Sequence, residues 1–143
     1  MPPMYLFTAL AIMVLLHFFI PVYRVMPYPL NAIGLIPLAV GIALNLAADN
    51  ALKKHGTTVR PFEESTSLIT TGVYKYSRNP MYLGMALIII GIALLMGSLS
   101  PYIIVPGFIA IIERVFISGE ETMLQQKFGH DWIAYREKVR RWL

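Results

Sequence analysis

The sequence has no cysteine, which excludes disulfide bonds and a cysteine nucleophile. It also has little charge: Asp, Glu, Lys and Arg make up 14% of its 143 residues, whereas 57% are hydrophobic. This composition is too apolar for a soluble single domain. The net charge of +4 is modest, and we expect no nucleic-acid partner. The sequence therefore predicts a protein whose main solvent is a lipid membrane.

Long uncharged stretches predict four transmembrane helices. Residues 1–23 and 26–48 carry no formal charge, and each stretch is long enough to cross a hydrocarbon core of about 30 Å. Residues 81–112 are also uncharged, but they are too long for one span and too short for two, so a break is predicted at residues 97–101. The fourth span reaches full length only by taking Glu113 and Arg114 to the membrane boundary. The predicted spans are residues 4–23, 30–49, 80–97 and 101–118.

Two polar segments remain, a loop at residues 50–79 and a tail at residues 119–143. Apolar residues of the tail recur at spacings of four and three, which is typical of an amphipathic helix lying on the membrane or on the protein, with a break expected at Gly129. Eleven of the twelve Lys and Arg residues lie in the loop, at the end of the fourth span or in the tail. The positive-inside rule therefore predicts that both termini and the active site are cytoplasmic. The predicted fold is an all-α membrane protein: a single membrane-embedded domain over residues 1–143, with four transmembrane helices, a cytoplasmic loop and a C-terminal amphipathic helix.

The most distinctive polar segment is residues 72–84, Gly-Val-Tyr-Lys-Tyr-Ser-Arg-Asn-Pro-Met-Tyr-Leu-Gly, which runs into the third predicted span. Pro80 suits the first position of that helix, because its missing N–H would be unpaired there and its φ angle is already helical. Arg78 and Asn79 then lie just before a helix N-terminus at the membrane surface. Free backbone N–H groups and the helix dipole favour an anionic group at such a place.

Three carboxylates lie at the end of the fourth predicted span. Glu113, Glu120 and Glu121 fall close together on a helical wheel, because seven residues make nearly two full turns. Carboxylates gathered at a membrane boundary need a cation nearby. Two kinds of cation fit: arginines of the chain, from Arg114, Arg78 or the tail, and a ligand with an ammonium or sulfonium group.

These motifs together resemble one family of integral membrane enzymes. The segment from Arg78 to Gly84, preceded by Gly-Val-Tyr-Lys-Tyr and followed by Glu120-Glu121 and Phe-Gly at 128–129, is similar to the isoprenylcysteine carboxyl methyltransferase and phospholipid N-methyltransferase family. The resemblance covers about residues 57–143. One departure is visible, because many relatives carry His where this chain has Asn79. The resemblance implies S-adenosylmethionine-dependent methyl transfer to a lipid-like or isoprenylated acceptor, a carboxylate or an amine, at the cytoplasmic membrane face.

The resemblance also indicates which residues form the site. In the family, the acidic residues that match Glu120 and Glu121 are implicated in S-adenosylmethionine binding, and we expect them to hold its ammonium or its ribose. Arg78 or free backbone N–H groups would hold a carboxylate of the cofactor or of the substrate. The expected cofactor-binding residues are Tyr74, Tyr76, Arg78, Asn79, Pro80, Tyr82, Gly84, Glu120 and Glu121. The expected catalytic residues are Arg78, Glu113 and Tyr82, and no metal is expected.

Several of these residues have a second interpretation from the sequence. Tyr82 also suits an interfacial anchor, and Gly84 also suits close helix packing. A carboxylate acceptor needs no general base, whereas an amine acceptor must first lose a proton. The residues that could take this proton are Glu113, Asp49 and His55.

Two other functions fit part of the pattern. Sterol reductases look similar in their C-terminal region, and an NADPH-dependent membrane reductase would use Lys53, Lys54 and Arg60 for the 2′-phosphate of the cofactor. A non-catalytic lipid-binding membrane subunit would need the acidic pair and Arg78 only for packing. The expected partners are membrane lipids, a lipid or prenylated substrate that enters from the bilayer and, through the Gly- and Ala-rich second span, a second copy of the chain. The identity of the acceptor depends on apolar packing, which a single sequence does not reveal.

Overall fold

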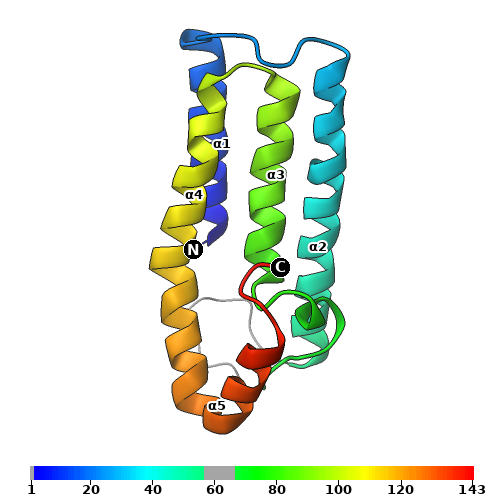
Figure 1. The fold of residues 1–143 in the computed structure, drawn as a ribbon, viewed down its shortest axis with the longest axis vertical. Coiled ribbons are helices and arrows are strands. Elements are labelled where there is room, and N and C mark those ends of the chain that lie inside the picture. Colours follow the sequence, from blue (N-terminus) through cyan, green and yellow to red (C-terminus); the bar gives the residue numbers. More distant parts are fainter. Residues whose placement is uncertain (1, 57–66) are drawn as a thin grey trace.

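The computed structural model describes residues 2–56 and 67–143, and this part of the chain is helical, without a named β-strand. The bundle consists of α1 (Pro2–Phe19), α2 (Leu35–Lys54), α3 (Pro80–Met96) and α4 (Ile104–Ile112) (Figure 1). A π-helical segment, Glu113–Ile117, joins α4 to α5 (Ser118–Lys138). Short 3-10 helices precede α2, α3 and α4, at Leu30–Gly34, Gly72–Lys75 and Ser100–Ile103.

Helix α3 is the centre of the bundle. It packs against α2 on one side and against α1 and α4 on the other (Figure 1). The main core lies between α1, α3 and α4, where Met13, Ile89 and Ile112 are fully buried. Large apolar side chains on the outer faces of α1 and α2 are exposed, as expected for helices that contact lipid.

The limits of helix α3 agree within one residue with those predicted for the third span, residues 80–97. Pro80 occupies the first turn of α3, as its fixed φ angle favours. Gly97 ends the helix in the left-handed conformation, with φ of 68°, which glycine adopts without a steric penalty. The carbonyl of Gly97 also accepts hydrogen bonds from the backbone of Val25 and Met26. This end of α3 is therefore tied to the connection between α1 and α2.

Glycines bring α2 and α3 into close contact. A Cβ atom added to Gly41 of α2 would lie 2.6 Å from the carbonyl oxygen of Gly84 in α3, and one added to Gly91 would lie 2.7 Å from the carbonyl oxygen of Gly34. Close approach through small residues is a common way to associate helices in lipid. Gly34 and Gly41, the glycines of the second predicted span, therefore face α3 within the same chain. The structure gives no support to a homodimer that uses them.

Replacing Gly41 by alanine is expected to destabilise the bundle by about 1–3 kcal/mol, because the new methyl group would collide with backbone that cannot yield easily. Thermal unfolding in detergent measures this effect. Gly107→Ala is the matched control, because a Cβ atom at Gly107 meets nothing within 4 Å. Equal melting temperatures for the two variants would show that α2 and α3 are not packed as described.

Two predicted helix ends differ from the structure. Helix α1 ends at Phe19 and not at residue 23. The chain leaves the helix there, and the carbonyl of Tyr23 accepts a hydrogen bond from the backbone N–H of Leu99. Helix α2 continues to Lys54 and not to residue 49. The added turn contains an ion pair between Asp49 and Lys53, with 2.5 Å between Oδ2 and Nζ. The predicted loop therefore begins after this turn, and residues 57–66 of it lie outside the described part.

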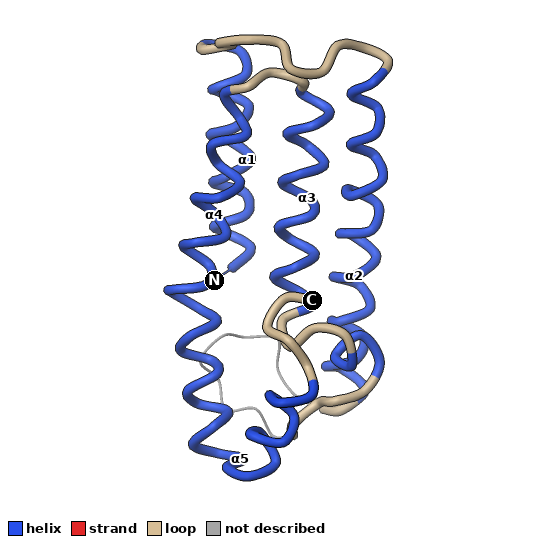
Figure 2. The backbone as a smooth tube through the Cα atoms, in the orientation of Figure 1, coloured by secondary structure: helices blue, strands red, loops and turns tan. Residues whose placement is uncertain are grey.

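The fourth helix does not end at residue 118. The chain continues without interruption through the π-helical segment into α5, so the helix itself does not mark the predicted boundary between span and tail. The expected break at Gly129 is confirmed, with φ of 48° and ψ of −114° in the middle of α5. Beyond Gly129 the helix turns back toward the bundle (Figure 2). Its buried residues Trp132 and Tyr135 pack with Leu68, Leu124 and Phe128, so protein covers this part of the tail.

Both termini lie at the same end of the bundle, as an even number of crossings requires (Figure 1). Among the described residues, three helical segments are long and apolar enough to cross a membrane: Pro2–Phe19, Leu30–Lys54 and Ser100–Lys138. Helix α3 is a shorter apolar helix of 17 residues. The count of four crossings therefore remains a prediction.

Candidate functional site

The start of α3 contacts the first turn of α5, which carries Glu120 and Glu121, at the end of the bundle where both termini lie. The Tyr82 hydroxyl donates a hydrogen bond of 2.6 Å to Oε1 of Glu120. The guanidinium of Arg78 lies beside Glu121, with 3.2 Å between Nη1 and Oε1. These two contacts join residues that are about forty positions apart in the sequence. We call the group Arg78, Tyr82, Glu120 and Glu121 the junction.

The π-helical segment sets the direction of the carboxylates. Its wider turn places the hydroxyl of Ser118 2.9 Å from the carbonyl oxygen of Glu113, five residues earlier. A π-helical turn adds a residue to the helix, so side chains that follow it are rotated relative to those before it. Glu121 and Glu113 consequently share one partner, although they are eight residues apart, while Glu120 points to Tyr82. Single π-helical turns are frequent at functional sites.

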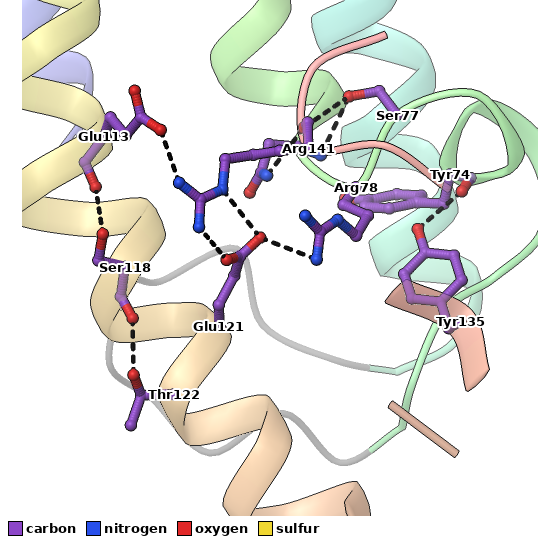
Figure 3. A network of polar contacts seen from close by, with 10 residues as sticks. Tyr74, Ser77, Arg78, Glu113, Ser118, Glu121, Thr122, Tyr135 and Arg141 are labelled. Carbon is purple, nitrogen blue, oxygen red and sulfur yellow. Dashed lines mark hydrogen bonds and ion pairs between the residues drawn. The ribbon is translucent and has the colours of Figure 1, made fainter. Parts of the chain in front are cut away.

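The shared partner of Glu113 and Glu121 is Arg141, from the tail (Figure 3). Its Nη1 donates to Glu113 over 2.6 Å, while Nη2 and Nε donate to Glu121 over 2.6 and 3.3 Å. The hydrogen bonds to Glu121 and Glu113 raise the pKa of the Arg141 guanidinium above its usual value. Among the arginines that the sequence analysis considered as partners of Glu113, the structure therefore pairs Glu113 with one from the tail, Arg141.

Arg78 is a buried cation with incomplete pairing. Its side chain is 8% exposed, and this burial lowers the pKa of its guanidinium. The guanidinium lies over the ring of Trp132, 5.6 Å from the ring centre. Within the described residues, Nε and Nη1 of Arg78 and Nε1 of Trp132 are buried without a hydrogen-bond acceptor, since the contact of Nη1 with Glu121 lacks hydrogen-bond geometry. Buried donors are normally paired, so this place suits an anionic group of a ligand.

The remaining residues of the predicted cofactor set are spread over the same end of the bundle. Burial raises the pKa of the Tyr74 phenol, with smaller contributions from Tyr135 and Glu120, and the carbonyl of Tyr74 accepts a 2.7 Å hydrogen bond from Tyr135. Pro80 is fully buried at the start of α3. Tyr76 is 74% exposed, and the structure does not bring it to the junction.

Asn79 and Gly84 contact other parts of the protein. The Asn79 side chain is buried and donates a 3.0 Å hydrogen bond to the carbonyl of Arg141. Gly84 lies against Gly41 and the side chain of Asn45, so packing between α2 and α3 is sufficient to explain a glycine there. A role of either residue in cofactor binding stays a prediction.

The residues considered as general bases are engaged elsewhere. Asp49 pairs with Lys53, and Nδ1 of His55 lies 2.8 Å from the carbonyl oxygen of Ala51. Glu113 pairs with Arg141. Lys53 and Lys54 are exposed at the end of α2, and Arg60 lies outside the described part.

Sequence reasoning did not identify Arg141 or Trp132 as site residues. Both reach the junction because the chain reverses at Gly129, after which Trp132 contacts Arg78 and Arg141 contacts Glu121. The glycine inside a helical pattern was the available signal, but it gives neither the angle of the turn nor the helix on which the returning segment packs.

Comparisons of the sequence with known proteins give one family. The sequence model described as phospholipid methyltransferase matches residues 30–131, which is more than half of the chain. A probable protein-S-isoprenylcysteine O-methyltransferase of Oryza sativa is 31% identical over 113 residues, which cover 75% of this chain and 57% of the relative. The protein-S-isoprenylcysteine O-methyltransferase of Saccharomyces cerevisiae is 39% identical over 80 residues, which cover 54% of this chain and 32% of the relative. The chain thus spans only part of the length of these curated relatives.

A solved structure has the same fold. The eukaryotic intramembrane Ras methyltransferase ICMT, an isoprenylcysteine carboxyl methyltransferase, superposes with a TM-score of 0.67 at 24% sequence identity. The match covers 96% of this chain and 50% of that chain. At this identity the likeness establishes the helical membrane fold, and the chemistry of the site has to be argued from the residues themselves.

Proposed function

This chain belongs to the phospholipid methyltransferase family, and from that premise we propose that it transfers a methyl group from S-adenosylmethionine to a lipid-like or isoprenylated acceptor. The chain is an integral membrane protein with the isoprenylcysteine methyltransferase fold. The observation that carries the proposal is the junction, where two carboxylates, a buried arginine and the start of a helix converge. Packing alone does not explain this arrangement, because Nε and Nη1 of Arg78 are buried donors without a hydrogen-bond acceptor in the described part of the chain.

The groups at the junction fit the chemistry of the cofactor. S-adenosylmethionine carries an ammonium, a carboxylate, a sulfonium and an adenine. Arg78 and the unpaired N–H group of Trp132 would hold its carboxylate, and Glu120 would hold its ammonium or its ribose. When bound, the cofactor would supply a methyl group on positively charged sulfur. A lone pair of the acceptor would form the new bond to the methyl carbon as the carbon–sulfur bond breaks, and S-adenosylhomocysteine would be the leaving group. Glu121, which already pairs with two arginines, would keep the site assembled.

The contribution of the protein to such a displacement is alignment and exclusion of water. Tyr82 fixes one oxygen of Glu120, and Glu121 fixes Arg78 against the face of Trp132. Trp132 and Tyr135 cover the same end of the bundle with buried aromatic surface. These contacts hold Glu120 and Glu121 on α5 and Arg78 just before α3 in fixed positions, and an in-line transfer requires such alignment.

A carboxylate acceptor makes the smaller demand on these residues. An amine must first lose a proton, and Glu113 and Asp49 both have their carboxylates in ion pairs. A carboxylate acceptor needs no such base. The names of the curated relatives, isoprenylcysteine O-methyltransferases, also favour a carboxylate. We therefore propose an isoprenylated carboxylate as the methyl acceptor, and an amine such as that of a phospholipid headgroup as the second candidate.

We further propose that the junction lies at the cytoplasmic face. The last turn of α2, with Lys53 and Lys54, lies at this end of the bundle together with the basic tail (Figure 1). Arg24 lies in the connection between α1 and α2, at the opposite end. The positive-inside rule places the more basic end in the cytoplasm, where the cofactor is found. The lipid substrate would enter sideways from the bilayer.

Methyl transfer in detergent or in vesicles tests the proposal. Purified protein is incubated with radiolabelled S-adenosylmethionine and either an isoprenylated cysteine carboxylate or a phospholipid with an amine headgroup. Label in either acceptor supports methyl transfer, and the labelled acceptor identifies the class. If no label is transferred and NADPH binds, the protein is a reductase. If neither cofactor binds, the lipid-binding subunit is the better explanation.

The Tyr82→Phe variant is expected to bind S-adenosylhomocysteine about tenfold more weakly, because one hydrogen bond to the carboxylate of Glu120 is lost. Isothermal calorimetry in detergent measures the change. Tyr28→Phe, at an exposed tyrosine near the opposite end, is the control and should bind as the wild type does. An affinity of Tyr82→Phe equal to that of the control would remove Tyr82 from the site.

A further inference from the structure

The end of the tail runs alongside the segment that precedes α3. The backbone N–H of Arg78 donates a 3.0 Å hydrogen bond to the carbonyl of Arg140. The next carbonyl, of Arg141, accepts hydrogen bonds from the Asn79 amide over 3.0 Å and from the Ser77 hydroxyl over 3.4 Å. Ser77 and Asn79 are both buried, at 2% and 8% exposure. The tail backbone is therefore fixed to the start of α3 at two consecutive peptide groups.

The same residue of the tail reaches the other side of the junction. The Arg141 backbone is held by the segment before α3, and its guanidinium bridges Glu113 of the π-helical segment and Glu121 of α5 (Figure 3). Arg141 thus connects the two halves of the junction. The position of its carbonyl determines where its guanidinium meets the two carboxylates.

The Asn79 side chain is directed to the tail and not to its own helix. Asn79 is the N-cap residue of α3, a position where an Asn side chain usually accepts a hydrogen bond from the first turn. No such capping bond is present here. The amide group instead donates to Arg141, and the backbone N–H of Asn79 donates to the Ser77 hydroxyl over 3.1 Å. Helix capping therefore does not explain this asparagine.

We propose that Asn79 is a positioning residue for the methyl-donor site, and that it acts by holding the Arg141 backbone so that the Arg141 guanidinium orients Glu121 and Glu113. This inference rests on the proposed function, because it assigns Asn79 a role in binding the same cofactor. The role requires a hydrogen-bond donor at residue 79 and no proton transfer. Asparagine supplies that donor at every pH, and a histidine ring N–H supplies one too.

A double-mutant cycle tests the proposal with S-adenosylhomocysteine as the probe, titrated by calorimetry into the full chain in detergent. Asn79→Asp removes the donor with little change of shape and should weaken binding about tenfold. In an Arg141→Leu background, where no guanidinium is left to position, the same change should alter the affinity less than about twofold. Asn79→His should restore affinity close to that of the wild type.

Asn31→Asp is the matched control. The Asn31 side-chain amide also donates to a backbone carbonyl, that of Leu95 over 2.8 Å, but it lies in the connection at the opposite end of the bundle. This variant should leave the affinity unchanged. Equal effects of Asn79→Asp with and without Arg141 would overturn the proposal, because they would mean that Asn79 contacts the cofactor directly. An Asn79→Asp variant that binds as tightly as the wild type would overturn it as well.

Hydrogen exchange separates this proposal from the proposed function. Amide exchange over residues 139–143 should be faster in Asn79→Asp than in the wild type and unchanged in Asn31→Asp. If the wild type does not bind S-adenosylhomocysteine and this exchange still accelerates, the function is wrong while the hold of Asn79 on the tail stands. If Asn79→Asp does not fold, Ser77→Ala takes its place in the cycle, with an expected effect of about threefold in the presence of Arg141 and none in its absence.

Discussion

Replacing Glu121 by glutamine is expected to weaken S-adenosylhomocysteine binding by about 100-fold. The carboxylate of Glu121 is 12% exposed and pairs with both Arg78 and Arg141. Glutamine keeps the shape but loses the charge, and removing one partner of a buried ion pair leaves the other charge uncompensated. Without this charge, the guanidinium groups of Arg78 and Arg141 would no longer be held beside residue 121. Calorimetry in detergent measures the affinity.

The control is Glu137→Gln, at an exposed carboxylate of the tail. This variant should bind the ligand as the wild type does. Circular dichroism should report the same helix content for both variants, since the apolar core between α1, α3 and α4 does not depend on Glu121. Retained affinity in Glu121→Gln would show that the carboxylate has no part in the site.

Replacing Arg78 by alanine is expected to reduce methyl transfer by about 100-fold, equivalent to about 2.7 kcal/mol. Arg78 presents buried donors without an acceptor beside the start of α3, which is where the carboxylate of the cofactor or of the substrate is expected. Arg78→Lys should recover only part of the activity, because lysine keeps the charge but not the planar fork of N–H groups. Steady-state kinetics with radiolabelled S-adenosylmethionine measures kcat and KM for each variant.

Arg24→Ala serves as the control, because Arg24 lies at the opposite end of the bundle, where its backbone pairs with Ser98. Its kinetics should match the wild type. A KM for S-adenosylmethionine that rises while kcat is unchanged would assign Arg78 to uniform binding of the cofactor. Wild-type values of both constants in Arg78→Ala would exclude Arg78 from the reaction.

The sequence was sufficient for the parts of the fold that follow from local rules. Pro80 and Gly97 mark the two ends of α3 because each fixes a backbone conformation that one helix terminus requires. The ion pair of Asp49 and Lys53 likewise joins residues at i, i+4 spacing, which places both side chains on one face of α2. The acidic residues were predicted at the end of the fourth span, and at this end of the bundle Glu120 and Glu121 contact the start of α3.

The parts that the sequence did not predict depend on contacts between distant segments. A one-residue change in helix register, as in Glu113–Ile117, leaves no composition signal, yet it decides that Glu121 and not Glu120 shares a partner with Glu113. The reversal at Gly129 brings Arg141 and Trp132 to the junction. The direction of the returning segment depends on tertiary packing against Leu68 and the first half of α5, which periodicity does not encode.

The central claim is that the junction binds the methyl donor, and titration of the wild-type chain with S-adenosylhomocysteine by calorimetry in detergent tests it most directly. The account predicts saturable binding at one site per chain, which is about 100-fold weaker in Glu121→Gln and unchanged in Glu137→Gln. The account would be contradicted if the wild type released no heat of binding with this ligand, or if Glu121→Gln bound it as tightly as the wild type.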